Sequence, residues 1–254
     1  MSQEDLRKKS EGEEITYRIG ELSRITGVKA GTIRFYEKCG FLGPVERTSN
    51  NYRIYCRRHI FQVRVCRLVF GGFVNRRLRR ESLKVLNASA EWNLAAYERE
   101  SANYLKAVEE DLERTRKAIA ICTGQMGKEE GEEVRYSKRQ AAAMTGVTSE
   151  TIRNWERNGL LGQFEPYERR QYGQALLNRM YVIRLLLDTG YSMMVIRSFV
   201  QAYEQGRREE AEQLLISPEK EELCCRSDRY LEELTNLRGK AARLRQMKSE
   251  MADI

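Results

Sequence analysis

The stretch TGVKAGTIRFYEKCGFLG, residues 26–43, decides the fold, because the chain repeats it as TGVTSETIRNWERNGLLG at residues 145–162. Ten of the eighteen positions are identical at a constant offset. They include a Thr-Gly pair at the start, a Thr-Ile-Arg triplet in the middle and a Leu-Gly pair at the end. Such agreement indicates an internal duplication, so we expect the 254-residue chain to hold two homologous domains.

Each copy has the pattern of two helices joined by a tight turn. Gly27 and Gly146 follow a short helical stretch and supply the residue that accepts positive φ. A second helix follows at once, and this arrangement is typical of a helix-turn-helix, whose second (recognition) helix enters the DNA major groove. Thr148 is placed to cap the second recognition helix, whereas Lys29-Ala30-Gly31 predicts an uncapped start for the first.

Within each recognition helix, one isoleucine (Ile33 or Ile152) is spaced to face inward. We expect an arginine and an aromatic residue to project elsewhere. An arginine can hold a phosphate or fork onto guanine, and an aromatic ring can pack on a sugar or a thymine methyl group. The predicted DNA contacts are therefore Arg34 with Tyr36 in the first copy, and Arg153 with Trp155 in the second.

A short run of arginine and aromatic residues follows each recognition helix, as NNYRIY at residues 50–55 and as RRQY at residues 169–172. The Asn-Asn pair and the alternation after it predict a small hairpin, the wing of a winged helix-turn-helix. Arg53 and Arg170 are predicted to lie on phosphates that flank the recognition helices.

Residues 17–73, with IGELSRITGV, TIRFYEKCGFLG and NYRIY in order, resemble the DNA-binding domain of the MerR family of bacterial transcription regulators. Residues 136–200 resemble a second such domain, although its wing is two residues shorter and Asn154 replaces the aromatic Phe35. The resemblance implies a regulator that bends and untwists an over-long promoter spacer so that RNA polymerase can use it. Such recognition is indirect readout, because the cost of deforming the DNA depends on its sequence. It also implies dimerisation through a long helix.

Charge and resemblance together define a set of candidate DNA-binding residues. The net charge is +8, and residues 47–84 hold eleven Lys and Arg residues against Glu81 alone, which favours an anionic partner. In the first half the candidates are Arg18, Lys29, Thr32, Arg34, Tyr36, Tyr52, Arg53 and Arg57. In the second half they are Lys138, Thr148, Thr151, Arg153, Trp155 and Arg170.

Two long amphipathic helices are predicted. Residues 90–122 lack Pro and Gly and carry a heptad seam, and Ser217-Pro218-Glu219 is a helix start before a second seam. An amphipathic helix alone cannot bury its stripe. Either the two helices pair within the chain, which gives a single-chain pseudo-dimer with an asymmetric operator, or each pairs with its copy in a homodimer.

The predicted fold class is mainly α: two winged helix-turn-helix domains, each followed by a long coiled-coil dimerisation helix. The expected order is a disordered tail (1–14), the first winged domain (15–89), coiled-coil helix 1 (90–123), a linker (124–134), the second winged domain (135–206) and coiled-coil helix 2 (207–254). At the start of a helix in residues 73–86, Asn75-Arg76-Arg77 departs from the family's usual Ser and acidic residues, and either adds phosphate contacts or weakens that helix start.

Other classes of protein find little support. One histidine, His59, excludes a multi-histidine metal site, and no Gly-rich phosphate loop is present, so we expect no catalysis and no cofactor. A metal or small-molecule effector stays open, with Cys122, Cys224 and Cys225 as weak metal candidates. The polar start and the lack of a long apolar run predict a cytoplasmic protein without a membrane span. The alternative functions are an architectural or excisionase-like DNA-bending protein and a coiled-coil protein-interaction adaptor.

Overall fold

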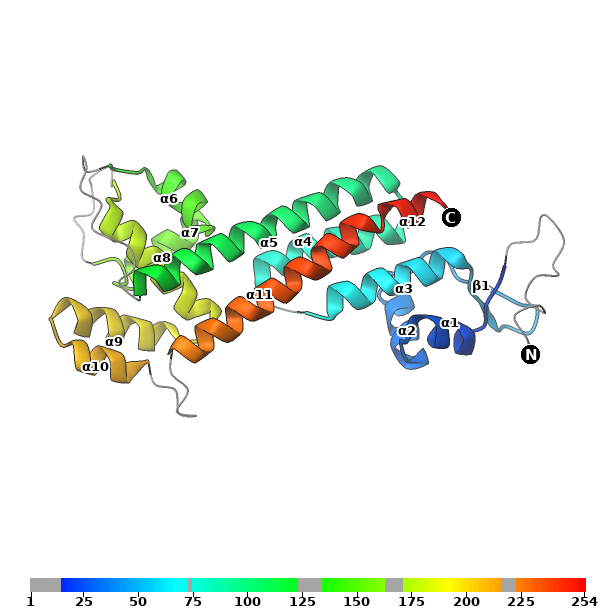
Figure 1. Ribbon diagram of the computed structural model, residues 1–254, viewed down its shortest axis with the longest axis horizontal. Coiled ribbons are helices and arrows are strands. Elements are labelled where there is room, and N and C mark those ends of the chain that lie inside the picture. Colours follow the sequence, from blue (N-terminus) through cyan, green and yellow to red (C-terminus); the bar gives the residue numbers. More distant parts are fainter. Residues whose placement is uncertain (1–14, 73–74, 123–133, 163–170, 216–222) are drawn as a thin grey trace. The chain divides into compact units, whose positions relative to one another are not determined.

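The computed structural model describes residues 15–72, 75–122, 134–162, 171–215 and 223–254. Helices dominate this part of the chain, which confirms the predicted mainly α class (Figure 1). The chain divides into two compact units, Met1–Ala107 with Arg238–Ile254, and Val108–Leu237. The predicted tail (1–14) and the helix start at Ser217-Pro218-Glu219 lie outside the described residues, as does most of the predicted linker (124–134).

The first unit begins with the predicted helix-turn-helix, α1 (Ile19–Thr26) and α2 (Ala30–Lys38). Gly27 ends α1 in the left-handed region at φ 67°. Lys29 precedes α2 without a side-chain hydrogen bond to the helix, as the sequence predicts. Leu22 of α1 and Ile33 of α2 are both fully buried, so these two residues lie in the core of the domain.

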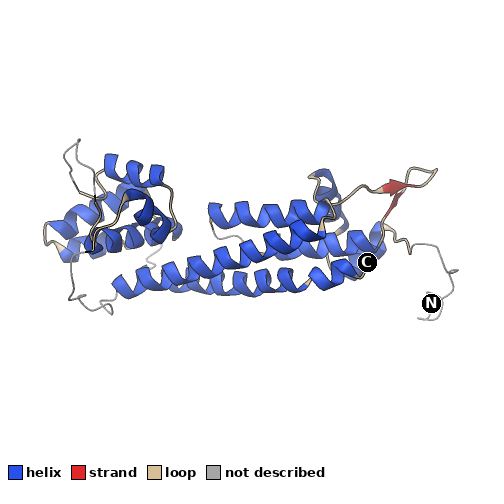
Figure 2. Ribbon diagram, turned by 90° about the horizontal axis from the view of Figure 1, so that it is seen from above, coloured by secondary structure: helices blue, strands red, loops and turns tan. Residues whose placement is uncertain are grey.

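A short hairpin follows α2. Strands β1 (Glu46–Arg47) and β2 (Arg53–Ile54) pair antiparallel, and they are the strands visible in Figure 2. Asn51 takes φ 63° in the turn between them, a conformation that asparagine accepts more readily than most residues. The backbone of Tyr55 pairs with that of Tyr17, which attaches the wing to the start of the domain. The predicted wing of the first domain is confirmed.

Three helices complete the N-terminal part of this unit: α3 (Arg57–Phe70), α4 (Arg76–Ala90) and the start of α5 (Leu94–Cys122). The side chain of Asn75 accepts a hydrogen bond from the Leu78 amide, so it caps α4. The helix predicted from residue 90 begins at Leu94 instead, because the chain turns at Trp92, whose φ is 56°.

The C-terminal segment of the chain completes the core of the first unit. It consists of the end of α11 (Leu223–Gln246) and α12 (Lys248–Ala252), and α12 contacts α3. The buried Tyr97 hydroxyl donates a hydrogen bond of 2.8 Å to the Leu244 carbonyl. Within this unit the N-terminal part of α5 therefore lies beside the C-terminal part of α11 (Figures 1 and 2).

The second unit repeats the helix-turn-helix as α6 (Lys138–Thr145) and α7 (Ser149–Arg157). Gly146 ends α6 at φ 70°, and the Thr148 hydroxyl accepts a hydrogen bond of 3.0 Å from the Thr151 amide, as its predicted cap role requires. Tyr136 and Tyr172 form a backbone bridge like that of the first domain. Residues 163–170, which include Arg169 and Arg170 of the predicted second wing, lie outside the described residues.

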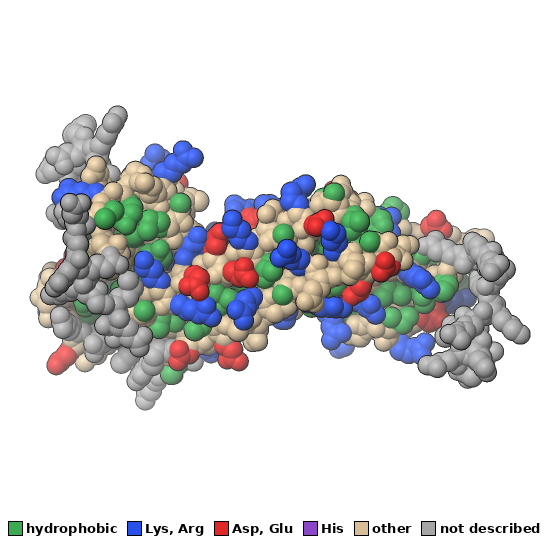
Figure 3. Space-filling view, turned by 45° about the horizontal axis from the view of Figure 1, so that its top comes forward, with side chains coloured by type: hydrophobic (Ala, Val, Ile, Leu, Met, Phe, Trp, Pro, Cys, Tyr) green, Lys and Arg blue, Asp and Glu red, His purple; other side chains and the backbone are tan. Residues whose placement is uncertain are grey.

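Helices α8 (Gln174–Asp188), α9 (Met193–Glu204) and α10 (Arg208–Leu214) complete the second domain, and the unit also contains the C-terminal part of α5 and the N-terminal part of α11. Ser192 caps α9, because its side chain accepts a hydrogen bond from the Val195 amide. Apolar side chains of both long helices are buried inside this unit, including Val108 and Leu112 of α5 and Leu234 of α11. On the face shown in Figure 3, basic and acidic side chains lie intermixed along the long helices.

Candidate nucleic-acid interface

The first recognition helix, α2, has an exposed basic face. Lys29, Arg34 and Lys38 are all exposed, and within the described residues no carboxylate pairs with them. Phe35 is 58% exposed, a large value for an apolar side chain. This face therefore offers three cations and one aromatic ring to a partner.

The aromatic residues predicted to project from the recognition helices do not do so. Tyr36 is 7% exposed and stacks on Phe70 with ring centroids 5.5 Å apart, and Trp155 is 1% exposed. Burial also raises the pKa of the Tyr36 hydroxyl. The prediction for Tyr36 and Trp155 is wrong, because each lies three residues after a buried isoleucine and shares its inward face.

The basic residues beside the recognition helices are partly engaged within their own domains. Arg53 of the wing donates to the Glu37 carboxylate of α2, with Nε and Oε2 2.8 Å apart. The equivalent Glu156 of α7 accepts from Lys138 at 2.8 Å, and the Tyr172 hydroxyl also donates to it. These contacts hold the wing or the first helix against the recognition helix. The phosphate contacts of Arg53 and Lys138 stay predictions.

The remaining candidates of the first domain surround the same face. Arg18, Tyr52 and Arg57 are exposed, and Thr32 is half-buried. Tyr52 lies beside the wing turn and is 66% exposed. Their DNA contacts also stay predictions.

The second recognition helix, α7, has an acidic residue on its exposed face. Glu150 pairs with Arg153 at 3.0 Å and with Arg157 at 3.1 Å. Gly31 occupies the corresponding position of the first copy. Thr151 is half-buried, and its hydroxyl lies 2.8 Å from that of the capping Thr148.

Arginines hold the turn of each helix-turn-helix, and our sequence analysis missed them. Arg67 of α3 donates to the Thr26 carbonyl at 2.9 Å, and Arg184 of α8 donates to the Thr145 carbonyl at 2.7 Å. In the second unit Arg114 of α5 adds a hydrogen bond of 3.0 Å to the Met144 carbonyl. The Arg-Leu pair that recurs at 67–68 and 184–185, each time directly after apolar residues, was the signal available in the sequence.

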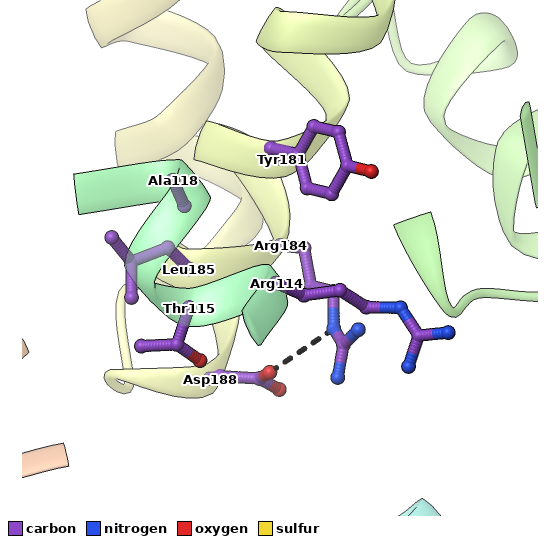
Figure 4. A pocket seen from close by; sticks show the side chains of 7 residues that line it. All are labelled: Arg114, Thr115, Ala118, Tyr181, Arg184, Leu185 and Asp188. Atoms are coloured by element: carbon purple, nitrogen blue, oxygen red, sulfur yellow. Dashed lines mark ion pairs between the residues drawn. The ribbon is translucent and has the colours of Figure 1, made fainter. Parts of the chain in front are cut away.

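Two aspartates complete the arrangement in the second unit, which we call the turn clamp: Arg114, Arg184, Asp111 and Asp188. The Asp111 side chain is fully buried and pairs with Arg184 at 2.9 Å and with Arg114 at 3.2 Å. Asp188 pairs with Arg184 at 3.3 Å, the ion pair drawn in Figure 4, and accepts from the Tyr230 hydroxyl of α11 at 3.1 Å. Desolvation by burial raises the pKa of Asp188, against the opposing effects of Arg184 and Tyr230.

The described residues offer few features that could bind a metal or small-molecule effector. Cys122 and Cys225 are exposed, the side chain of Cys224 lies outside the described part, and the described residues contain no group of three or more metal-ligating side chains. A hollow of about 290 Å³ lies beside Asp188, Arg226 and Tyr230 in the second unit, with a largely polar wall. Among the described residues, no helix is both long and apolar enough to cross a membrane.

In comparison with known proteins, two segments of the chain match models of MerR-type regulatory proteins. The model for the MerR family regulatory protein matches residues 18–55, and that for the MerR HTH family regulatory protein matches residues 136–203. No solved structure matches the chain significantly.

Several curated relatives match over a short stretch. The HTH-type transcriptional regulator HmrR of Sinorhizobium medicae is 39% identical over 49 residues, which is 19% of this chain and 33% of that protein. The mercuric resistance operon regulatory protein of Bacillus cereus is 43% identical over 44 residues, 17% of this chain and 33% of its own length. The HTH-type transcriptional repressor CarA of Myxococcus xanthus is 40% identical over 57 residues, 22% of this chain and 20% of its own.

The matched stretches thus span about a third of these relatives or less. The similarity therefore concerns one domain and not the whole length of each relative. Two separate stretches of this chain match models of the same family, and each contains a helix-turn-helix with a glycine in the left-handed region. The chain is a tandem MerR-like protein, with two MerR-family segments in one polypeptide.

Proposed function

We propose that the protein is a sequence-specific transcription regulator that binds double-stranded promoter DNA. One observation carries the proposal: the basic face of α2, with Lys29, Arg34 and Lys38 unpaired by any carboxylate of the described residues, lies on the second helix of a helix-turn-helix. Recognition helices of this kind dock in the major groove, where arginine reads guanine and lysine holds phosphate. The relatives are themselves named as transcriptional regulators and a repressor.

We further propose that the two domains act as a single-chain pseudo-dimer. In the first unit Tyr97 of α5 is buried and bonds to Leu244 of α11. In the second unit Asp111 of α5 and Tyr230 of α11 both bind the α8 pair Arg184–Asp188. These contacts within the chain support intramolecular pairing of α5 and α11 over a homodimer of four domains.

The promoter mechanism belongs to the same proposal. Two units that each place a recognition helix in one duplex would bend and untwist the DNA between them, so specificity would depend partly on deformability. RNA polymerase is the expected partner, because it would use the promoter whose spacer has been bent and untwisted. Because the two recognition helices differ at Phe35 and Asn154, the preferred operator is expected to be asymmetric.

The test is a fluorescence anisotropy titration of the full chain on duplex from its own upstream region, against a scrambled duplex, at two salt concentrations. The matched variants are Arg34→Ala and, as control, Arg99→Ala, an exposed arginine of α5 that pairs with Glu100. Arg34→Ala should weaken specific binding by about 1–3 kcal/mol if the arginine reads a base. Arg99→Ala should bind like the native chain.

Each alternative gives a distinct result. Equal, weak binding to both duplexes would contradict the regulator and favour the adaptor. Saturation with two chains per site would contradict the pseudo-dimer. Bending in a fluorescence energy transfer assay, with no effect on transcription by purified RNA polymerase, would favour the architectural protein.

A further inference from the structure

The two recognition helices differ in charge at equivalent positions. Lys29, Gly31, Arg34 and Lys38 of the first copy correspond to Thr148, Glu150, Arg153 and Arg157 of the second. The first set carries three cations, and the second carries two cations and one carboxylate. The difference in formal charge between these sets is therefore two, +3 against +1.

We propose that Glu150 restrains the second recognition helix: it occupies Arg153 and Arg157 in the free chain, so the second domain binds DNA more weakly than the first. This inference rests on the proposed function. It assigns to the two domains unequal contributions to DNA affinity, with the larger contribution from the first.

The geometry supports a shared contact. Glu150 holds Arg153 through Oε2 at 3.0 Å and Arg157 through Oε1 at 3.1 Å. The spacings of three and seven residues put all three side chains on one face of α7. All three are exposed, with side-chain exposures of 64% for Glu150, 61% for Arg153 and 68% for Arg157. A carboxylate that contacts two arginines of a recognition helix occupies the guanidinium groups that a phosphate would otherwise bind.

Exposed ion pairs contribute little to stability, so DNA phosphates can replace Glu150 as the partner of these arginines. After that exchange the carboxylate stays close to the phosphate backbone, where like charges repel. Glu150 should therefore change DNA affinity and its salt dependence more than the stability of the fold. A simpler explanation is that Glu150 only stabilises the N-terminal end of α7, because an acidic side chain there interacts favourably with the helix dipole.

The first experiment compares the native chain with Glu150→Gln in DNA titrations over a range of salt. Loss of the carboxylate should strengthen binding by about 3- to 10-fold near physiological salt and steepen the dependence of log K on log salt by about one. If Glu150 only stabilises the helix start, Glu150→Gln should lower the melting temperature slightly and leave the salt slope unchanged.

The reciprocal change uses Gly31, where a Cβ atom would meet no other atom within 4 Å. Gly31→Glu should weaken binding by about 3- to 10-fold and flatten the salt slope by about one relative to Gly31→Gln, which shares its size and helix propensity. Glu113→Gln removes an acid that is 76% exposed on α5, and it should change neither affinity nor slope.

The outcome also separates this inference from the proposed function. The scrambled duplex tests phosphate binding without sequence recognition, so the slope change of Glu150→Gln should appear there too. A native chain that prefers its own upstream duplex, with a Glu150→Gln variant of unchanged affinity and slope, would overturn the inference alone. A native chain without any sequence preference would overturn the proposed function, and the slope comparison would still decide the role of Glu150.

Discussion

The two helix-turn-helix domains hold the same turn in different ways. In the first, the exposed Arg67 donates to the Thr26 carbonyl, and within the described residues no carboxylate pairs with that arginine. In the second, Arg184 makes the equivalent bond at 9% exposure and also binds two aspartates of the turn clamp. The same backbone turn thus sits in two electrostatic environments.

This difference shows how two copies of one duplicated motif can come to be held by different contacts. The aspartates and the second arginine that hold Arg184 and its turn come from α5 and α8, and α11 adds Tyr230. Buried charge-assisted bonds of this kind depend strongly on one another. The turn before α7 is therefore tied to three helices outside its own motif, α5, α8 and α11, and we expect a change in any of them to affect the second recognition helix.

The largest expected effect is the loss of the buried arginine. Arg184→Met leaves Asp111 buried without one of its two arginine partners, which should destabilise the second unit by about 3–5 kcal/mol. Arg67→Met removes one hydrogen bond to a carbonyl and should cost about 1 kcal/mol. Hydrogen exchange of the amides after each turn, combined with urea unfolding, measures both. Equal losses in the two variants would show that the turn clamp has no special role.

The turn glycines give a smaller and more local comparison. A Cβ at Gly27 would lie 3.0 Å from Arg67 Nη1, whereas one at Gly146 would lie 2.4 Å from Arg184 Nη1 and 2.9 Å from Arg114. Both substitutions by alanine carry left-handed strain of about 1–2 kcal/mol. Gly146→Ala should cost about 1–3 kcal/mol more, because it displaces hydrogen-bonded guanidinium groups. Differential scanning calorimetry would detect the difference, and similar melting temperatures would argue against a rigid clamp.

Substitutions at the starts of the two recognition helices should change stability by smaller amounts. Thr148→Ala removes the cap of α7 and should cost about 1 kcal/mol. Gly31→Ala replaces a helical glycine that has open space around it, and should stabilise α2 by up to about 1 kcal/mol. Circular dichroism melts of both variants test these opposite signs. A destabilising Gly31→Ala would mean that the glycine is needed for a close approach.

The smallest expected effect depends on pH. Because burial raises the pKa of Asp188 above its ordinary value of 3.8, the folded state binds this proton more tightly than the unfolded state. Stability contributed by Asp188 should therefore rise as the pH falls through the raised pKa towards 3.8. Asp188→Asn lacks this contribution, so the stability difference between the two proteins should vary in that pH window. Parallel urea titrations at several pH values would show it, and a constant difference would contradict the shift.

The sequence predicted the local structure of the repeats well. Gly27 and Gly146 take positive φ, the Thr148 cap forms, and the first wing is a hairpin with Asn51 in its turn. These features depend on residues close together in the chain, and their residue types have few alternative uses. The prediction that Tyr36 and Trp155 project from the recognition helices was wrong. Their spacing of three residues from the buried isoleucines indicates that they share the inward face.

The ion pairs of the turn clamp could not be predicted from the sequence, although the recurring arginine could be noticed. Asp111 and Arg184 come from two helices far apart in the chain, and neither residue type normally marks a buried position. Heptad spacing places Leu112 and Thr115 on the apolar seam of α5. It does not show that the neighbouring Asp111 will face Arg184 of α8. The pairing of Arg153 with Glu150 was also not predicted, because an acidic residue at a helix start is already explained by its favourable interaction with the helix dipole.

The contact between Tyr97 and Leu244 has a consequence for the synthesis of the chain. Its partners are 147 residues apart, and residues Arg238–Ile254 belong to the same compact unit as the N-terminal domain. Contacts over such separations form late, since the intervening chain must first be ordered or looped out. On the ribosome the N-terminal domain emerges long before the helix that covers Tyr97. We therefore expect the surface around Tyr97 to stay uncovered until the C-terminal part of α11 has been synthesised.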